Sequence, residues 1–333
     1  MTSRPPTSWP RVLAAPGLVR IRRALLVVTS GGVLLVQGCD RPAPAVPGDS
    51  ARAGVNGAPP VSATEPTEGS GWDEAAGAYL VLPTVDGGMM AGSLLRPEAI
   101  DATVGDTTGV ATMIGDGRLD LFARTGLVHT ARLSVESAAA VEAGCTAWPV
   151  ARLAVDAGVT MAPWTAAFAA GRVTAMPLDS IEGLPARDSA ALAANLTRLA
   201  SRLPDDTSAT FRGLPFVVLR AWRSRDGADA FVVAVLARRV NQEDNPVEER
   251  VVLVVDTPSR EVTSWRVGWH ERASGNEEEL VVAEPLLAFR VSGANDVRLL
   301  FGRDDGVALG AAVLARRDGA WRVLWESAIA GCS

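Results

Sequence analysis

Two nearly identical pentapeptides lie 56 residues apart in the second half of the chain, Trp265-Arg266-Val267-Gly268-Trp269 and Trp321-Arg322-Val323-Leu324-Trp325. Their first, third and fifth residues are bulky and apolar, and this period of two is typical of a strand with one buried face. Those three residues are therefore predicted to share a face. Each pentapeptide follows another apolar run, Val251–Val255 or Ala311–Ala315, so each is expected to be the second arm of an antiparallel hairpin. The repeat predicts duplicated sheets or propeller blades, unless the pentapeptide is simply a favourable strand sequence in a chain of this composition.

Short apolar runs broken by Gly, Asp and Asn predict further strands on both sides of these hairpins. Asp-Gly pairs at 116–117, 305–306 and 318–319 are suited to two-residue hairpin turns. Phe231–Ala237 and Val251–Val255 are apolar on both faces, so both faces should be covered, as in a sandwich, a propeller blade or a sheet under a helix. The expected strands are Ala78–Leu82, Gly109–Ile114, Leu119–Arg124, Leu127–Leu133, Ala147–Val155, Pro215–Trp222, Ala230–Val240, Arg250–Asp256, Val262–His270, Leu280–Val291, Val297–Phe301, Ala308–Ala315 and Trp321–Ser327.

One helix is predicted at about 188–203, where leucines recur every three or four residues. Asp188 or Ser189 can cap its amino end, and Pro204 ends it. Ser134–Ala143 is compatible with a helix or with the continuation of a strand. The expected fold is mainly β, with antiparallel sheets and one helix, propeller-like or with duplicated sheets; the alternative is α+β.

The amino terminus has the pattern of an export signal. Three arginines at 20, 22 and 23 precede the apolar run Ala24–Val36, which is shorter than the roughly 20 residues needed to span a bilayer. The following Val36-Gln37-Gly38-Cys39 resembles the lipobox of bacterial lipoproteins. The resemblance implies that residues 1–38 are removed and that Cys39 carries a lipid in the cell envelope, with the domain outside the cytoplasm, periplasmic or at the surface.

Residues 39–71 are expected to form a lipidated, disordered tether, because Arg41–Gly71 has six prolines and no aromatic residue. The β-rich domain is expected to cover 72–333. After removal of 1–38 the chain has 27 arginines against 38 acidic residues, a net charge of −11, which disfavours nucleic acid. The chain has no lysine, which excludes Schiff-base lysines, P-loops and Ser–Lys hydrolases.

Cys145 and Cys332 are expected to form one disulfide in an exported domain; free thiols or a redox centre are the alternatives, although there is no Cys-x-x-Cys. His129 and His270 fit no metal spacing, and no Gly-x-Ser-x-Gly occurs. Ile114–Leu121 weakly resembles the end of a propeller calcium loop, with Asp116 and Asp120 as candidate ligands, but a hairpin turn is favoured. The nine tryptophans are expected mainly in the core.

These observations predict no catalytic residue, no metal and no cofactor. The expected function is a lipid-anchored envelope protein whose β-rich domain binds a protein or a small ligand without catalysis. A hydrolase acting on envelope material is one alternative, and would require a histidine facing a serine or an acid. A purely structural lipoprotein is the other, and a large exposed apolar patch would favour the binding protein over it.

Overall fold

The computed structural model describes residues 71–84, 88–95, 117–136, 145, 147–204, 209–225, 230–240, 246–257, 264–276, 280, 283–304 and 308–331. They belong to one compact unit within Val61–Ser333. The expected signal peptide, Cys39, the tether up to residue 70 and Cys332 lie outside the described residues, as does the strand predicted at Gly109–Ile114.

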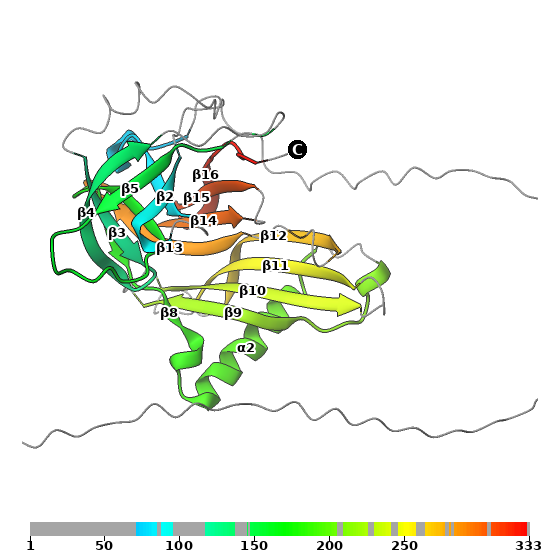
Figure 1. The fold of residues 1–333 in the computed structure, drawn as a ribbon. Helices are drawn as coiled ribbons and strands as arrows, with labels where there is room; N and C mark the ends of the chain where they lie inside the picture. Colours follow the sequence, from blue (N-terminus) through cyan, green and yellow to red (C-terminus); the bar gives the residue numbers. More distant parts are fainter. Residues whose placement is uncertain are drawn as a thin grey trace, which may run out of the picture. The chain divides into compact units, whose positions relative to one another are not determined.

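Six strands close into a small antiparallel barrel near the amino end of the unit (Figure 1). Its interior is filled by side chains such as Val81, Leu94, Leu121 and Trp164, as expected for a barrel of so few strands. The strands, in their order around the barrel, are β1 (Leu80–Pro83), β2 (Ala91–Leu95), β5 (Val150–Ala154), β4 (Gly126–Glu136), β3 (Arg118–Ala123) and β6 (Ala166–Ala169).

Two five-stranded antiparallel sheets follow, and both have the same plan. Each is a four-stranded meander with one short strand added beside its first member. The first sheet runs in the order β12 (Arg266–Asn276), β11 (Val247–Asp256), β10 (Phe231–Val240), β9 (Val217–Ser224) and β8 (Asp179–Ser180). The second sheet runs in the order β16 (Ala320–Glu326), β15 (Leu309–Arg317), β14 (Arg298–Asp304), β13 (Glu284–Val291) and β7 (Val173–Met176).

The two pentapeptides occupy equivalent places, because each lies at the last strand of its meander. Both also contain a β-bulge at the fourth residue. Val254 and Val255 of β11 pair with Trp269 and Val267, so Gly268 is the extra residue. In the same way, Val313 and Leu314 of β15 pair with Trp325 and Val323, and Leu324 is extra. The first strands of the two meanders match as well, with the extra residue in third position in each. The predicted duplication of sheets is thus observed, whereas the closed barrel was not predicted.

The bulges correct the expected distribution of the tryptophans. Because one inserted residue reverses the faces of all that follow, the first and fifth residues of a pentapeptide point to opposite sides. Trp265 packs towards the helix side of the first sheet, while Trp269 packs against Phe301 between the sheets, with ring centroids 5.5 Å apart. Trp321 lies between the sheets, and Trp325 lies on the barrel side. The prediction of a shared face is wrong for both pentapeptides.

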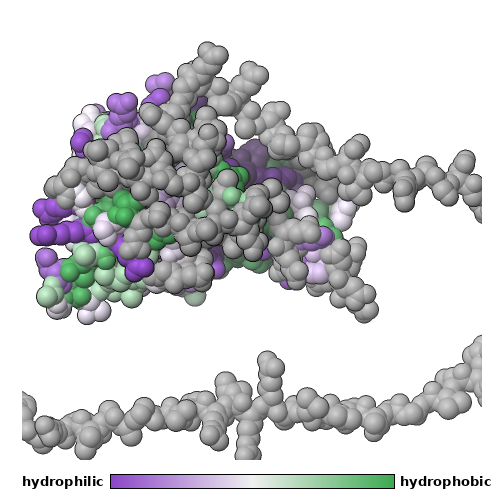
Figure 2. Space-filling view, turned by 45° about the horizontal axis from the view of Figure 1, so that its top comes forward, coloured by the Kyte–Doolittle hydropathy of each residue, from purple (hydrophilic) through white to green (hydrophobic). Residues whose placement is uncertain are grey.

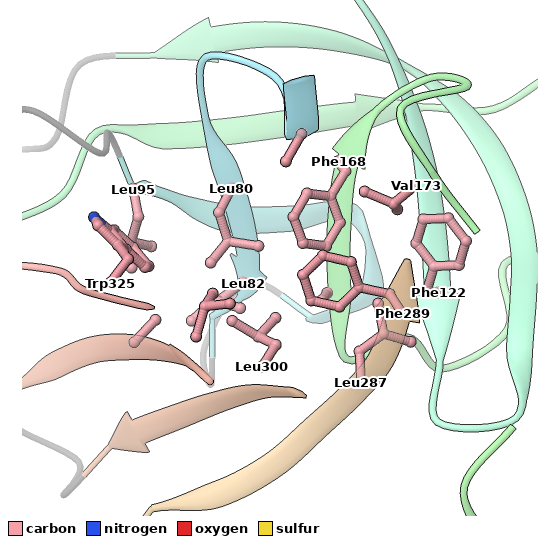
Figure 3. Packing of buried hydrophobic residues seen from close by; sticks show 14 of the residues in the cluster. Leu80, Leu82, Leu95, Phe122, Phe168, Val173, Leu287, Phe289, Leu300 and Trp325 are labelled. Atoms are coloured by element: carbon pink, nitrogen blue, oxygen red, sulfur yellow. The ribbon is translucent and has the colours of Figure 1, made fainter. Parts of the chain in front are cut away.

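The unit is layered, with the barrel, the second sheet, the first sheet and helix α2 (Ala186–Ala200) in that order (Figure 1). The second sheet packs on the barrel through Phe289, Leu287 and Leu300, which meet Phe168, Leu80 and Leu82 (Figure 3). Its other face packs on the first sheet, and α2 covers the far face of the first sheet. The prediction that the doubly apolar strands are covered on both faces is confirmed.

Helix α2 begins two residues earlier than predicted and ends at Ala200, and Leu192 and Leu196 lie in its buried face. Its amino-terminal cap is Pro185, with no side-chain hydrogen bond, so the predicted caps Asp188 and Ser189 are wrong. Ser134–Glu136 continue strand β4, which settles the first part of the ambiguous segment; 137–143 lie outside the described residues. Short 3-10 helices cover Glu74–Ala76 (η1), Gly88–Met90 (η2), Ile181–Gly183 (η3) and Ala209–Phe211 (η4).

The Asp318-Gly319 pair forms the two-residue turn between β15 and β16, as predicted. Both residues have positive φ, 52° and 72°, which is the geometry that favours Asp-Gly in tight hairpins. Asp116 and the pair at 305–306 lie outside the described residues. Four short strands were not predicted, namely β2, β6, β7 and β8.

Candidate functional site

The predicted lipidation and disulfide residues are only partly described. Cys145 is half-buried, between β4 and β5. Cys39 and Cys332 lie outside the described residues, so lipidation and the Cys145–Cys332 pairing stay predictions.

His129 on β4 is a structural contact of the loop that follows β5. Its Nε2 accepts a hydrogen bond from the backbone N–H of Ala162 at 3.2 Å, and it lies 3.1 Å from the carbonyl oxygen of Thr160. Both neighbours are main-chain atoms, which hold the loop against the barrel and provide neither the serine nor the acid of a catalytic pair. His270 is half-buried on β12, opposite Leu253. The contacts of His129 give the hydrolase alternative no support.

Asp120, a candidate calcium ligand, uses its carboxylate to connect strands. Oδ1 accepts a hydrogen bond from Thr130 Oγ1 at 2.7 Å, and Oδ2 accepts one from the Gly171 N–H at 2.8 Å. These bonds tie β3 to β4 and to the turn after β6. Among the described residues, no group of three or more His, Cys, Asp or Glu side chains could hold a metal ion.

The described tryptophans are buried or half-buried and belong to the cores, as expected. One cavity opens where Trp72 meets Trp325, next to Asp73 and Arg298, and its volume is about 10 Å³. That is room for about one water molecule, far below the several hundred Å³ of a typical ligand pocket. The binding of a small ligand therefore finds no support in this cavity.

Buried charged residues concentrate where β10 ends and β11 begins. Facing α2, Arg238 Nε donates to Glu249 Oε2 at 2.5 Å, and Arg272 Nη1 donates to Glu249 Oε1 at 3.0 Å. The Arg238 guanidinium also lies over the rings of Phe211 and Phe216. These groups close the end of the core under α2, and the pairing offsets the cost of burying the charges.

On the opposite face, Glu248 accepts hydrogen bonds from Arg250 and Arg239. Burial raises the pKa of Glu248, but the two guanidinium groups outweigh it, so the pKa lies below its ordinary value of 4.5. A depressed folded-state pKa means that the ionised carboxylate stabilises the fold. This contribution is complete above pH 4.5 and is lost as the pH falls through the lowered pKa.

Glu248→Gln is therefore expected to flatten the acid side of the stability profile. Urea unfolding at a series of values from about pH 6 to pH 3 should show a smaller loss of unfolding free energy in the variant than in the wild-type protein. Equal slopes in both proteins would show that Glu248 does not contribute to the pH dependence.

The outer side of β9 is an exposed apolar surface. Val217 and Leu219 are 61% and 47% exposed, and Leu214 just before the strand is exposed as well. We call Leu214–Ala221 the β9 edge. The neighbouring strand β8 pairs with β9 only through Asp179↔Arg223 and Ser180↔Trp222. Along the rest of β9, no described strand lies on that side.

A polar junction lies next to the β9 edge. Arg124, in the turn after β3, donates to Glu284 Oε1 at 2.5 Å and to the carbonyl oxygen of Pro285 at 2.7 Å. Its guanidinium lies 4.9 Å from the ring centroid of Trp222. Arg220 on β9 reaches the same Glu284 oxygen at 3.2 Å. The barrel and both sheets are thus joined at this point, which holds the β9 edge in a defined orientation.

Hydrophobic residues reach the surface elsewhere in smaller groups. On the face drawn in Figure 2, they lie among hydrophilic residues at the barrel end, on the left. Exposed apolar side chains outside the β9 edge include Met89, Met90, Leu127, Val159, Val323 and Ile329.

Sequence reasoning predicted the β9 strand but missed its role as a sheet edge. Strand position depends on which segments pair across the sheet, and the two-residue partner β8 has no recognisable strand pattern. One local signal was present in the sequence. Val217, Val218 and Leu219 are three consecutive apolar residues, so apolar side chains lie on both faces of the strand, and one of these faces stays uncovered.

No protein-family model matches the chain, and no curated protein or solved structure is significantly similar to it. Within the described residues, no helix has both the length and the apolar character needed to cross a membrane.

Proposed function

We propose that this protein is a lipid-anchored protein of the cell envelope whose β-rich domain binds another protein without catalysis. The β9 edge carries the binding role, because it combines exposed apolar side chains with a stretch, Val217–Ala221, that no described strand pairs with on its outer side. The anchoring role rests on Val36-Gln37-Gly38-Cys39 and on the basic and apolar segments before it. The exposed edge favours a binding protein over a purely structural lipoprotein.

Cys39→Ala is expected to release the protein from membranes, because the lipid would be its only lasting attachment. Cell fractions washed at high salt and high pH should contain the wild-type chain in the membrane and the variant in the soluble fraction. Gln37→Ala, at the variable position of the motif, is the matched control and should remain anchored. A Cys39→Ala chain that resists washing would contradict lipid anchoring.

We also propose that Cys145 and Cys332 form a disulfide. Three residues after Cys145, Trp148 Nε1 donates to the carbonyl oxygen of Leu309 at 3.0 Å. Two residues before Cys332, Ala330 exchanges both backbone hydrogen bonds with Leu309, at 2.7 and 3.0 Å. The two segments that carry the cysteines therefore both contact Leu309. This shared contact supports the short distance between Cys145 and Cys332 that a disulfide needs.

The binding role is tested by crosslinking in intact cells, capture through a carboxy-terminal tag and mass spectrometry. The expected result is one recurrent envelope partner, and the Cys39→Ala protein serves as a mislocalised control. Absence of any partner above background from repeated captures would contradict the proposal.

A further inference from the structure

The β9 edge has the backbone geometry of a site for strand addition. Val217, Val218, Arg220 and Ala221 pair with β10 on one side, and their other side has no described strand neighbour. Such an edge exposes N–H and C=O groups that an extended peptide can pair with. The stretch is five residues long, from Val217 to Ala221, a common length for a strand.

The exposed part of β9 has only part of the protection that is usual at strand edges, because Pro215 precedes it and Leu219 forms a bulge. Proteins commonly blunt an edge with proline, inward-pointing charge or a covering element. β9 contains no proline, and its most exposed apolar residues are Val217 and Leu219. By contrast, the last strands of the two meanders meet each other, since Trp321 packs closely against Gly268. Leu219 is the extra residue of the bulge, and its side chain is 47% exposed.

The segment that contains the β9 edge has a charge opposite to that of the whole protein. Residues 209–225 contain Arg212, Arg220, Arg223 and Arg225 and no acid, in a chain of net charge −6. The Arg220 side chain is 63% exposed, although its guanidinium also pairs with Glu284 at 3.2 Å. A second copy of this chain would bring like charges together, whereas an acidic segment would be attracted.

We propose that the β9 edge binds an extended segment of a partner protein in which acidic residues alternate with apolar ones, by adding it as a strand to the first sheet. This inference rests on the proposed binding function and names its site and the chemistry of its partner. Backbone pairing provides affinity for any extended chain. Val217 and Leu219 select apolar side chains, and Arg212 and Arg220 select carboxylates.

The test uses a fluorescein-labelled synthetic peptide of alternating glutamate and valine, titrated into the full-length chain in detergent and followed by fluorescence polarisation. Leu219→Glu is expected to weaken binding about tenfold or more, since it adds a like charge beside the peptide and removes an apolar contact. Val323→Glu on β16 is the matched control, an apolar residue next to a bulge with 42% exposure against 47% for Leu219, and should change the affinity less than about twofold. A peptide with arginine in place of glutamate should bind far more weakly.

Hydrogen exchange locates the bound peptide. The expected result is new protection of the Val217–Ala221 amides that point away from β10 when the glutamate–valine peptide is added. Lack of peptide binding, or protection confined to another element, overturns the inference. So does protection, in the free protein, of the Val217–Ala221 amides that point away from β10, where dependence on protein concentration indicates a second copy and independence indicates the chain's own segment.

Failure of this inference is distinguishable from failure of the proposed function. If crosslinking recovers the same envelope partner with wild-type and Leu219→Glu protein, the binding function stands and the β9 edge is not its site. If no partner is recovered while the synthetic peptide binds as expected, the edge is a strand acceptor and the cellular role is overturned.

Discussion

Replacing Glu249 with alanine is expected to cost about 3–5 kcal/mol of unfolding free energy, because it leaves buried arginines without their counter-charge. Glu249 and Arg238 have side chains only 1% and 3% exposed, and Arg272 is 11% exposed. The cations cannot reach water without opening the core under α2. Urea denaturation with an unchanged slope should report the loss as a lower midpoint.

Two further variants test whether burial of the charges causes this loss of unfolding free energy. Glu284→Ala removes the centre of a similar two-arginine cluster whose carboxylate is 44% exposed, and should cost less than about 1 kcal/mol. Replacing the three buried residues together, as Arg238→Met, Glu249→Leu and Arg272→Met, should restore most of the stability, since apolar side chains of similar volume need no partners. Equal losses for Glu249→Ala and Glu284→Ala would contradict the role of burial.

Reduction of the proposed Cys145–Cys332 disulfide is expected to be the other large effect. It should lower the unfolding free energy by up to about 5 kcal/mol in the chain-entropy model. The bond would close a loop containing two of the six barrel strands and both sheets, and a long loop restricts the unfolded chain most. Thermal unfolding of the soluble Cys39→Ala protein should therefore shift to lower temperature with dithiothreitol.

The matched control is the same protein with Cys145→Ser and Cys332→Ser, which should not respond to the reductant. Peptide mapping without reductant should yield one peptide pair containing both cysteines. Two free thiols after oxidising purification would refute the pairing.

The composition and the period of two were sufficient to predict the mainly β fold. The long strands are identified by runs such as Phe231–Ala237, in which β-branched and aromatic residues prefer the pleated backbone. The short strands were missed because their residues have little strand preference. β6 reads Ala-Ala-Phe-Ala, and it is a strand because β1 and β3 pair with it. In β2, Gly92 is required by a close approach, since a Cβ there would lie 2.6 Å from the carbonyl oxygen of Leu82.

The candidate site shows the same division between local and long-range information. Sequence reasoning identified the strand at 215–222 and the absence of recognised catalytic motifs. It could not identify the β9 edge, because exposure of Val217 and Leu219 follows from where the two-residue strand β8 ends. It also placed the tryptophans of each pentapeptide on one face, which the bulges at Gly268 and Leu324 reverse.

By itself, the sequence determined the strand-rich character, the position of the main helix, the Asp318-Gly319 turn and the need to cover both faces of the central strands. These properties depend on residues close together in the chain, through alternation, helical spacing and turn chemistry. Only the tertiary structure decided the barrel closure, the two matched meanders, the bulges that divide each tryptophan pair, and the open edge of β9. Each of these depends on pairing between distant segments, where the partner strand and its register set which side chains are buried.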